Sequence, residues 1–174
     1  MKPDDSSMAR GLASDYYKAA EEDYELLEYI RLTEFSYYGN GCMLAARYAE
    51  KIMKARLLLL GIDVGWTHDQ KVLVNSFPDF EGKQRALEIA SILTSYATQA
   101  AYPSMIRDNI SPEDAEEAYD LSMELVILTS CFETDAPNSR IVQTTLSNKK
   151  LFPKKRGLFD RFRKRGNCSV PLFC

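Results

Sequence analysis

The sequence has few of the residues that enzymes use for acid–base and metal chemistry. Among 174 residues there is one histidine, His68, and none of the four cysteines forms a Cys-x-x-Cys pair typical of zinc or redox sites. The carboxylates follow no metal-ligand spacing, since neighbours such as Glu21, Glu22 and Asp23 point in three directions around a helix. We therefore expect no metal site and no cofactor.

Long apolar runs and glycine-rich phosphate loops are also missing. The longest aliphatic run is the four leucines at residues 57–60, whereas a membrane span needs about 20 apolar residues. The first residues are polar and acidic with no apolar stretch behind them, so we expect no secretory signal, a cytoplasmic location and free thiols. Residues 61–65 contain two glycines but lack the Lys-Ser/Thr that follows in a phosphate-binding loop.

Charge is distributed unevenly along the chain. The net charge is −3, from 22 basic and 25 acidic residues. Residues 149–165 hold nine basic residues and one acidic residue, which leaves 13 basic and 24 acidic residues, a balance of −11, for the rest. The body therefore lacks the basic surface that phosphate-driven nucleic-acid binding requires.

Five segments show the three- and four-residue apolar spacing of amphipathic helices. We expect helices over residues 9–32, 42–60, 68–77, 81–102 and 112–132. Gly61 is a natural C-terminal cap for the second, and Ser111 followed by Pro112 is a strong start signal for the last. Thr67 is the expected N-cap of the third helix, and the fourth, apolar almost all round, is expected to be the most buried.

No segment alternates with a period of two, so we predict no sheet. The fold class predicted is all-α, an antiparallel up-and-down bundle of four to five helices over residues 8–132. Residues 133–174 are predicted to be a basic tail that is disordered or only locally helical.

The second segment carries a charged stripe at helical spacing. Arg47, Glu50, Lys51 and Lys54 share the face opposite its apolar side, and Glu50 precedes Lys54 by four residues, the favourable order for an ion pair. Two interpretations remain open. The favoured one is a solvated face neutralised by Glu50, and the other is a phosphate-binding stripe.

His68 and Asp69 are the only neighbours that could form a histidine–carboxylate pair. Adjacent helical residues project about 100° apart, so Asp69 is poorly placed to hold the imidazole. We favour a structural role, in which Thr67 and Asp69 satisfy the first free amides of the helix and His68 is packed or solvated. A ligand contact by His68 is the alternative.

Four segments in order resemble HEPN domains over residues 8–132. They are Ala-Ala-Arg-Tyr-Ala-Glu-Lys-Ile-Met-Lys-Ala at 45–55, Thr-His-Asp at 67–69, Ala-Tyr-Pro at 101–103 and Pro-Glu-Asp-Ala at 112–115. The resemblance implies an antiparallel bundle of four or five helices, usually a homodimer, with a role in nucleotide- or RNA-linked systems. Many members of that family are partners of a minimal nucleotidyltransferase, and others are ribonucleases of toxin and defence systems.

The chain departs from that family at positions that matter for chemistry. Its ribonucleases carry an arginine four to six residues before a histidine, but the nearest arginine before His68 is Arg56, twelve residues away. Ala101 stands where the family often has an arginine that would bind phosphate, and Gln70 stands where leucine is common. We therefore predict no catalytic residues. The remaining candidates for ligand binding are Arg47, Lys51, Lys54, His68, Asp69 and Tyr102.

The resulting hypothesis is a non-catalytic, homodimeric binding or partner module, with a nucleotidyltransferase and a nucleotide as candidate partners. One alternative is a degenerate ribonuclease that uses His68. The other is an adaptor that acts through the basic tail, where residues 157–165 interleave large apolar and basic side chains. For that tail, a solvated end, docking onto a partner or another subunit's acidic body, and contact with RNA or an anionic membrane all remain open.

Overall fold

The computed structural model describes residues 5–33, 37–101 and 110–132 of the chain. Every regular element within these ranges is helical, which confirms the predicted all-α fold class. The elements are α1 (Asp5–Leu32), α2 (Tyr38–Leu59), α3 (Gln70–Ser76), α4 (Lys83–Ala101), α5 (Pro112–Leu128) and the 3₁₀ turn η2 (Thr129–Phe132). The predicted tail over residues 133–174 lies outside the described residues.

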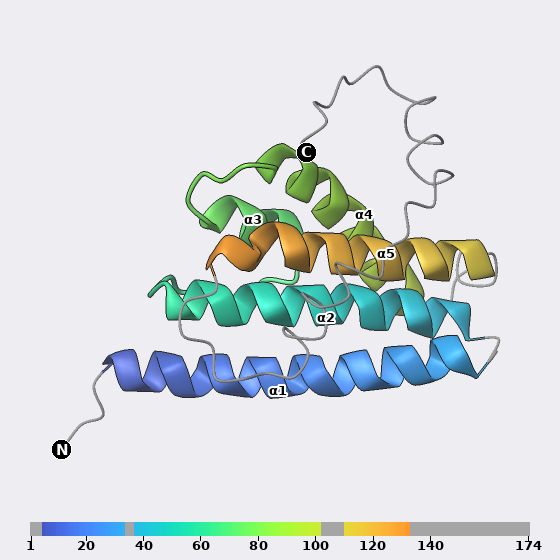
Figure 1. The fold of residues 1–174 in the computed structure, drawn as a ribbon, viewed down its shortest axis with the longest axis horizontal. Helices are drawn as coiled ribbons and strands as arrows, with labels where there is room; N and C mark the ends of the chain where they lie inside the picture. Colours follow the sequence, from blue (N-terminus) through green and yellow to red (C-terminus); the bar gives the residue numbers. More distant parts are fainter. Residues whose placement is uncertain (1–4, 34–36, 102–109, 133–174) are drawn as a thin grey trace.

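The four long helices run alternately in opposite directions, so the bundle is antiparallel and up-and-down as expected (Figure 1). The short helix α3 lies in the connection between α2 and α4 (Figure 1). Helix α2 occupies the centre, where it packs against α1, α4 and α5 and, near its end, against α3.

The centre of the bundle is α2 and not α4, so the expectation that the fourth helix is the most buried was wrong. Fifteen residues of α2 are buried, and they cover most of its circumference. Helix α4 buries one face only, through Ala86, Ile89, Ala90 and Leu93. The physical reason is topological, because a helix with neighbours on three sides buries charged residues as well as apolar ones.

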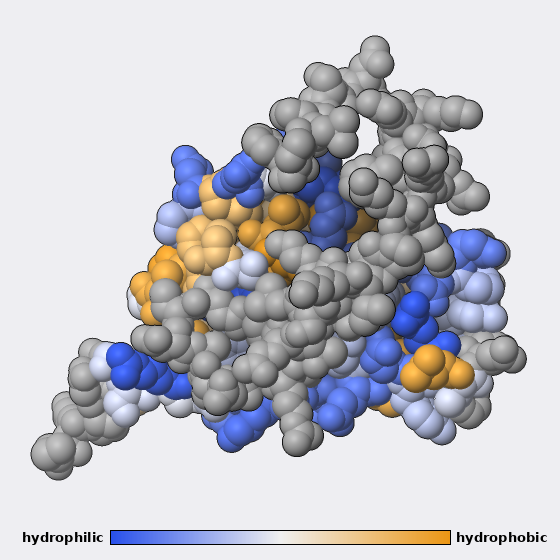
Figure 2. Space-filling view, in the orientation of Figure 1, coloured by the Kyte–Doolittle hydropathy of each residue, from blue (hydrophilic) through white to orange (hydrophobic). Residues whose placement is uncertain are grey.

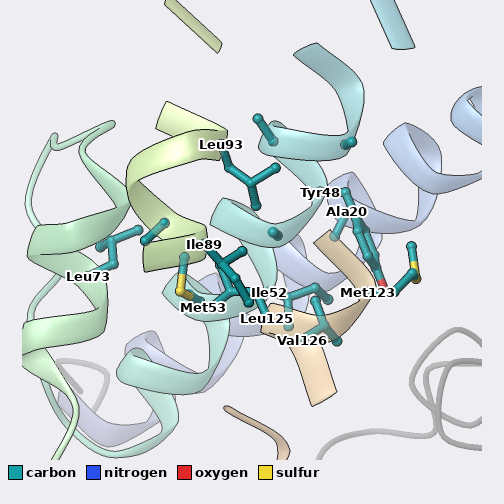
Figure 3. Close-up of a cluster of buried hydrophobic side chains, with 14 of the residues drawn as sticks. Ala20, Tyr48, Ile52, Met53, Leu73, Ile89, Leu93, Met123, Leu125 and Val126 are labelled. Carbon is teal, nitrogen blue, oxygen red and sulfur yellow. The ribbon is translucent and has the colours of Figure 1, made fainter. Parts of the chain in front are cut away.

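Side chains from all five helices meet around α2 in one core (Figure 3). Ala20 of α1, Leu73 of α3 and Leu93 of α4 approach it from three directions (Figure 3). Helix α5 adds Leu125 and Val126, both buried. Because neighbouring helices share this core, α2 fixes the positions of the segments that begin and end beside it.

The helix ends follow their local signals in most cases. Gly61 has a φ of 73°, and the N–H groups of Gly61 and Ile62 donate to the carbonyls of Leu58 and Leu57, which closes α2 with a Schellman motif. Ser111 caps α5 through a capping box with Asp114, as its sequence predicts.

Several boundaries differ from expectation. Helix α2 begins at Tyr38, four residues early, and α1 already includes Asp5. Helix α3 is capped by Asp69 and not by Thr67, because the Asp69 carboxylate accepts from the backbone N–H of Lys71. Helix α5 ends at Leu128, and its last predicted turn is the 3₁₀ segment η2.

Arg56 ties α2 to the end of α5. Its side chain is fully buried, and Nη1 donates to the Val126 carbonyl and to Thr129 Oγ1, each at 2.7 Å. A guanidinium at the C-terminal end of a helix satisfies free carbonyls and interacts favourably with the helix dipole. These partners explain how the charge of Arg56 is tolerated on the inward side of α2.

We expect Arg56→Ala to lower the free energy of unfolding by about 3–5 kcal/mol, because it removes two charge-assisted hydrogen bonds and leaves a cavity. Urea denaturation followed by circular dichroism measures this change. The exposed Arg10→Ala is the matched control and should change the value by less than about 0.5 kcal/mol. Equal stabilities of the two variants would contradict a stabilising role for the hydrogen bonds between Arg56 and the end of α5.

Candidate functional site

The charged stripe of α2 faces α1 and is largely buried, so the favoured interpretation of a solvated face was wrong. Glu50 is 7% exposed and Lys54 is 4% exposed. Lys51 is half-buried, and only Arg47 is exposed among these four residues. The spacing of residues predicts two distinct faces for α2, but in the bundle α1 packs against the charged face.

Two groups of ion pairs lie along this seam between α1 and α2. In the first, Lys54 Nζ lies 2.9 Å from Glu50 Oε1, which confirms the predicted pairing, and 5.7 Å from the ring centroid of Tyr16. In the second, Lys51 Nζ lies 2.6 Å from Asp23 Oδ2, and Arg47 Nε lies 3.6 Å from the same oxygen.

His68 joins the first of these groups from the loop after α2. Its Nδ1 lies 3.0 Å from Glu50 Oε1, while the side chain is 83% exposed to water. Asp69 is not its partner, because that carboxylate caps α3, and Thr67 Oγ1 accepts from the Asp69 N–H. The expected separation of His68 from Asp69 is therefore confirmed, and Glu50 is the carboxylate that orients the imidazole.

The cations of this site already have anionic partners. Lys51 also donates to the Ala19 carbonyl at 3.0 Å, so its ammonium binds both Asp23 and the backbone of α1. Lys54 lies beneath Glu50 and is almost completely shielded from water. A phosphate could reach these lysines only by displacing a carboxylate from a buried position, which carries a large desolvation cost.

Other groups that could do chemistry are engaged elsewhere. Arg56 is fixed to the end of α5 and is fully buried, so it offers no exposed guanidinium. Burial, reinforced by the charge of Asp114, raises the pKa of the Cys42 thiol to about 12, which makes this thiol a poor nucleophile. Within the described ranges, no cluster of three or more His, Cys, Asp or Glu side chains could hold a metal ion.

The sequence missed two residues that shape this site. Asp23 lies on the inward stripe of α1, three residues after Ala20 and four before Leu27, and a carboxylate in an apolar stripe is the signal that could have found it. Trp66, in the loop before His68, is 99% exposed, which only the structure reveals. Tyr102, the last predicted ligand residue, lies outside the described residues.

Comparison with known protein families gives one result. The model of the HEPN domain matches residues 13–130, from the first buried alanine of α1 into η2. No curated protein and no solved structure matches the chain. In the part of the chain that the structure covers, no helix is long and apolar enough to cross a membrane.

Glu50 and Lys54 should be energetically coupled, so that removing both charges costs less than the sum of the two single removals. Glu50→Gln and Lys54→Met should each lower the free energy of unfolding by roughly 3 kcal/mol, because each leaves a buried charge without its partner. The double variant should recover about 2 kcal/mol relative to the sum of the single changes, measured as a double-mutant cycle in urea.

The surface pair Asp15–Lys18 supplies the control for that cycle. Its atoms are 3.9 Å apart and its side chains are 73% and 72% exposed. The cycle of Asp15→Asn and Lys18→Met should give a coupling below about 0.5 kcal/mol. A coupling energy at Glu50–Lys54 as small as that of the surface pair would contradict the prediction that burial strengthens the dependence of each charge on its partner.

Proposed function

The chain belongs to the HEPN domain family, and on this basis we propose that it is a non-catalytic binding module that acts through a protein partner. The observation that carries the proposal is the loop between α2 and α3. This loop presents Trp66, 99% exposed, beside His68, 83% exposed. A tryptophan in full contact with water contributes nothing to the core, whereas tryptophan is among the residues most enriched at the energetic centres of interfaces.

The loop that carries Trp66 is held in shape by its own hydrogen bonds. Asp63 Oδ1 accepts from the N–H of Gly65 at 3.1 Å, and Gly65 has a φ of 52°, which suits glycine. On the other side of Trp66, the contact between His68 and Glu50 fastens the loop to α2. A preformed loop loses little conformational entropy on binding, which favours its use as a docking element.

The pairing of Lys54 with Glu50 supports the non-catalytic part of the proposal. Cleavage of RNA by a histidine needs a neighbouring positive group to stabilise charge on the phosphate. Lys54 shares the carboxylate of Glu50 with His68, and the charge of Lys54 is neutralised by that carboxylate.

A nucleotidyltransferase is the partner that we propose, because many members of the family act beside one. Nucleotide recognition then belongs to the partner, since Lys51 and Lys54 of this chain already bind carboxylates. We further propose that the chain is a homodimer, as the family resemblance implies.

Trp66→Ala should weaken binding of the nucleotidyltransferase at least tenfold, because truncation of an interface tryptophan typically costs about 2 kcal/mol or more. Calorimetric titration of the purified partner measures the affinity. The stability of the chain should stay within about 0.5 kcal/mol of the unchanged protein, since Trp66 is exposed.

Tyr37→Ala is the matched control for this experiment. Tyr37 is 60% exposed and precedes α2, at the end of the helix opposite to Trp66. Unchanged affinity in Trp66→Ala, or an equal loss in both variants, would contradict the proposed docking loop. Light scattering on the chain alone shows whether Trp66→Ala instead alters self-association.

One geometric observation favours a second candidate function. Glu50 orients the exposed His68 imidazole at 3.0 Å, an arrangement that general acid–base catalysts share. A degenerate ribonuclease that uses His68 would need a phosphate-binding cation other than Lys54, which Glu50 neutralises.

An RNA-cleavage assay with His68→Ala separates the two functions. We expect any cleavage by the purified chain to be the same in His68→Ala and in the unchanged protein, which identifies it as background. Glu50→Gln serves as a second variant, because it weakens the orientation of the imidazole and keeps the histidine. A loss of cleavage of about a hundredfold in His68→Ala, with a smaller loss in Glu50→Gln, would favour the ribonuclease.

A further inference from the structure

The outer face of the second half of α1 combines acidic and large apolar side chains. Leu26, Tyr29 and Leu32 are 49%, 56% and 74% exposed, and the carboxylates of Glu22 and Glu25 are exposed beside them. Positions 22, 25, 26, 29 and 32 follow the three- and four-residue steps of one helix face. Figure 2 shows an apolar patch surrounded by hydrophilic surface at the end of the molecule where α1 ends.

This face points away from the core of the bundle. Helix α1 buries its opposite side, including Ala20 and Leu27, against α2. No ion pair within the described ranges involves Glu22 or Glu25. The face therefore presents uncompensated negative charge together with apolar area, and it suits a ligand that is both basic and apolar.

Helices α4 and α5 lack this combination. Among the described residues, the large apolar side chains that are exposed lie mainly on α1, and none lies on α4 or α5. Exposed acids such as Glu88 of α4 and Glu113 of α5 thus lack apolar neighbours of that kind. A basic and apolar ligand gains ionic contacts at any acidic surface, but it buries large apolar side chains on α1 and not on α4 or α5.

The chain itself contains a segment with the complementary composition. Residues 158–165 read Leu-Phe-Asp-Arg-Phe-Arg-Lys-Arg, with three large apolar residues and four cations against one acid. The body carries a balance of −11, so a basic segment of the same chain is drawn to it electrostatically.

We propose that residues 158–165 dock on the outer face of α1 in the same molecule, with their cations at Glu22 and Glu25 and their apolar side chains over Leu26, Tyr29 and Leu32. The 25 residues between Phe132 and Leu158 can span at most roughly 80–90 Å. Helix α1, with 28 residues, is about 42 Å long, so the segment can reach any part of it. Attachment to the same chain also gives the segment a high effective concentration at this face.

Zero-length carbodiimide cross-linking of the full chain tests this proposal, because it joins a lysine amine only to a carboxylate in direct contact. We expect cross-links from Lys164 to Glu22 or Glu25 in the fraction with the mass of one chain, quantified by peptide mass spectrometry. Their yield should exceed the yield to Glu88 and Glu113, the matched exposed acids of α4 and α5, at least fivefold.

Two variants separate specific docking from attraction between opposite charges. Leu26→Ser combined with Leu32→Ser should lower the cross-link yield roughly tenfold, because it removes apolar area that the segment buries. Leu26 is 49% exposed and Leu32 is 74% exposed, so the two substitutions should leave the core intact. Circular dichroism checks that the variant remains folded. Lys164→Arg keeps the charge and removes the amine, so it should abolish the Lys164 cross-links alone.

Three outcomes would overturn the proposal. Equal yields at Glu22, Glu88 and Glu113 would show non-specific charge attraction. An unchanged yield in the double leucine variant would show that the apolar face takes no part. Cross-links found only in the fraction with the mass of two chains would place the segment on a second copy and not on its own α1.

Discussion

Glu50 and Lys54 form an ion pair on the central helix with both charged groups almost removed from water. Such a pair is tolerated only when each charge keeps its partner, so the distance between α1 and α2, the rotation of α2 and the position of the following loop are coupled. His68 contributes from that loop by contacting the same carboxylate. Glu50, Lys54 and His68, which belong to the segments that resemble the family, therefore stabilise the packing of the bundle.

The same constraint extends across α2. Lys51 pairs with Asp23 of α1, and Arg56 donates to the last turn of α5. Each inward charge of the helix thus meets a different neighbour, which favours one arrangement of the bundle over alternatives with similar apolar packing. These cations already have partners, which is why we propose that binding uses other surfaces.

Those surfaces lie at the ends and on the outside of the bundle. Trp66 lies in the loop that the His68–Glu50 contact attaches to α2. Helix α1 presents acidic and apolar side chains on the side away from the core. The two proposals made here use separate parts of the molecule, since Trp66 follows α2 and the docking face belongs to α1. The interior contains paired charges, and the outer surface exposes large apolar side chains. Both features are consistent with the proposed role as a protein-binding module.

The sequence alone was sufficient for the all-helical class, the five helices, the capping of α5 at Ser111 and the Glu50–Lys54 pair, because these depend on spacing and on groups close along the chain. It could not decide that α2 is central, that its charged stripe is covered by α1, or that Glu50 and not Asp69 holds His68. Those features depend on contacts between residues far apart in sequence. Apolar spacing shows that a helix has a buried face, but only the packed bundle determines whether a second face is buried as well.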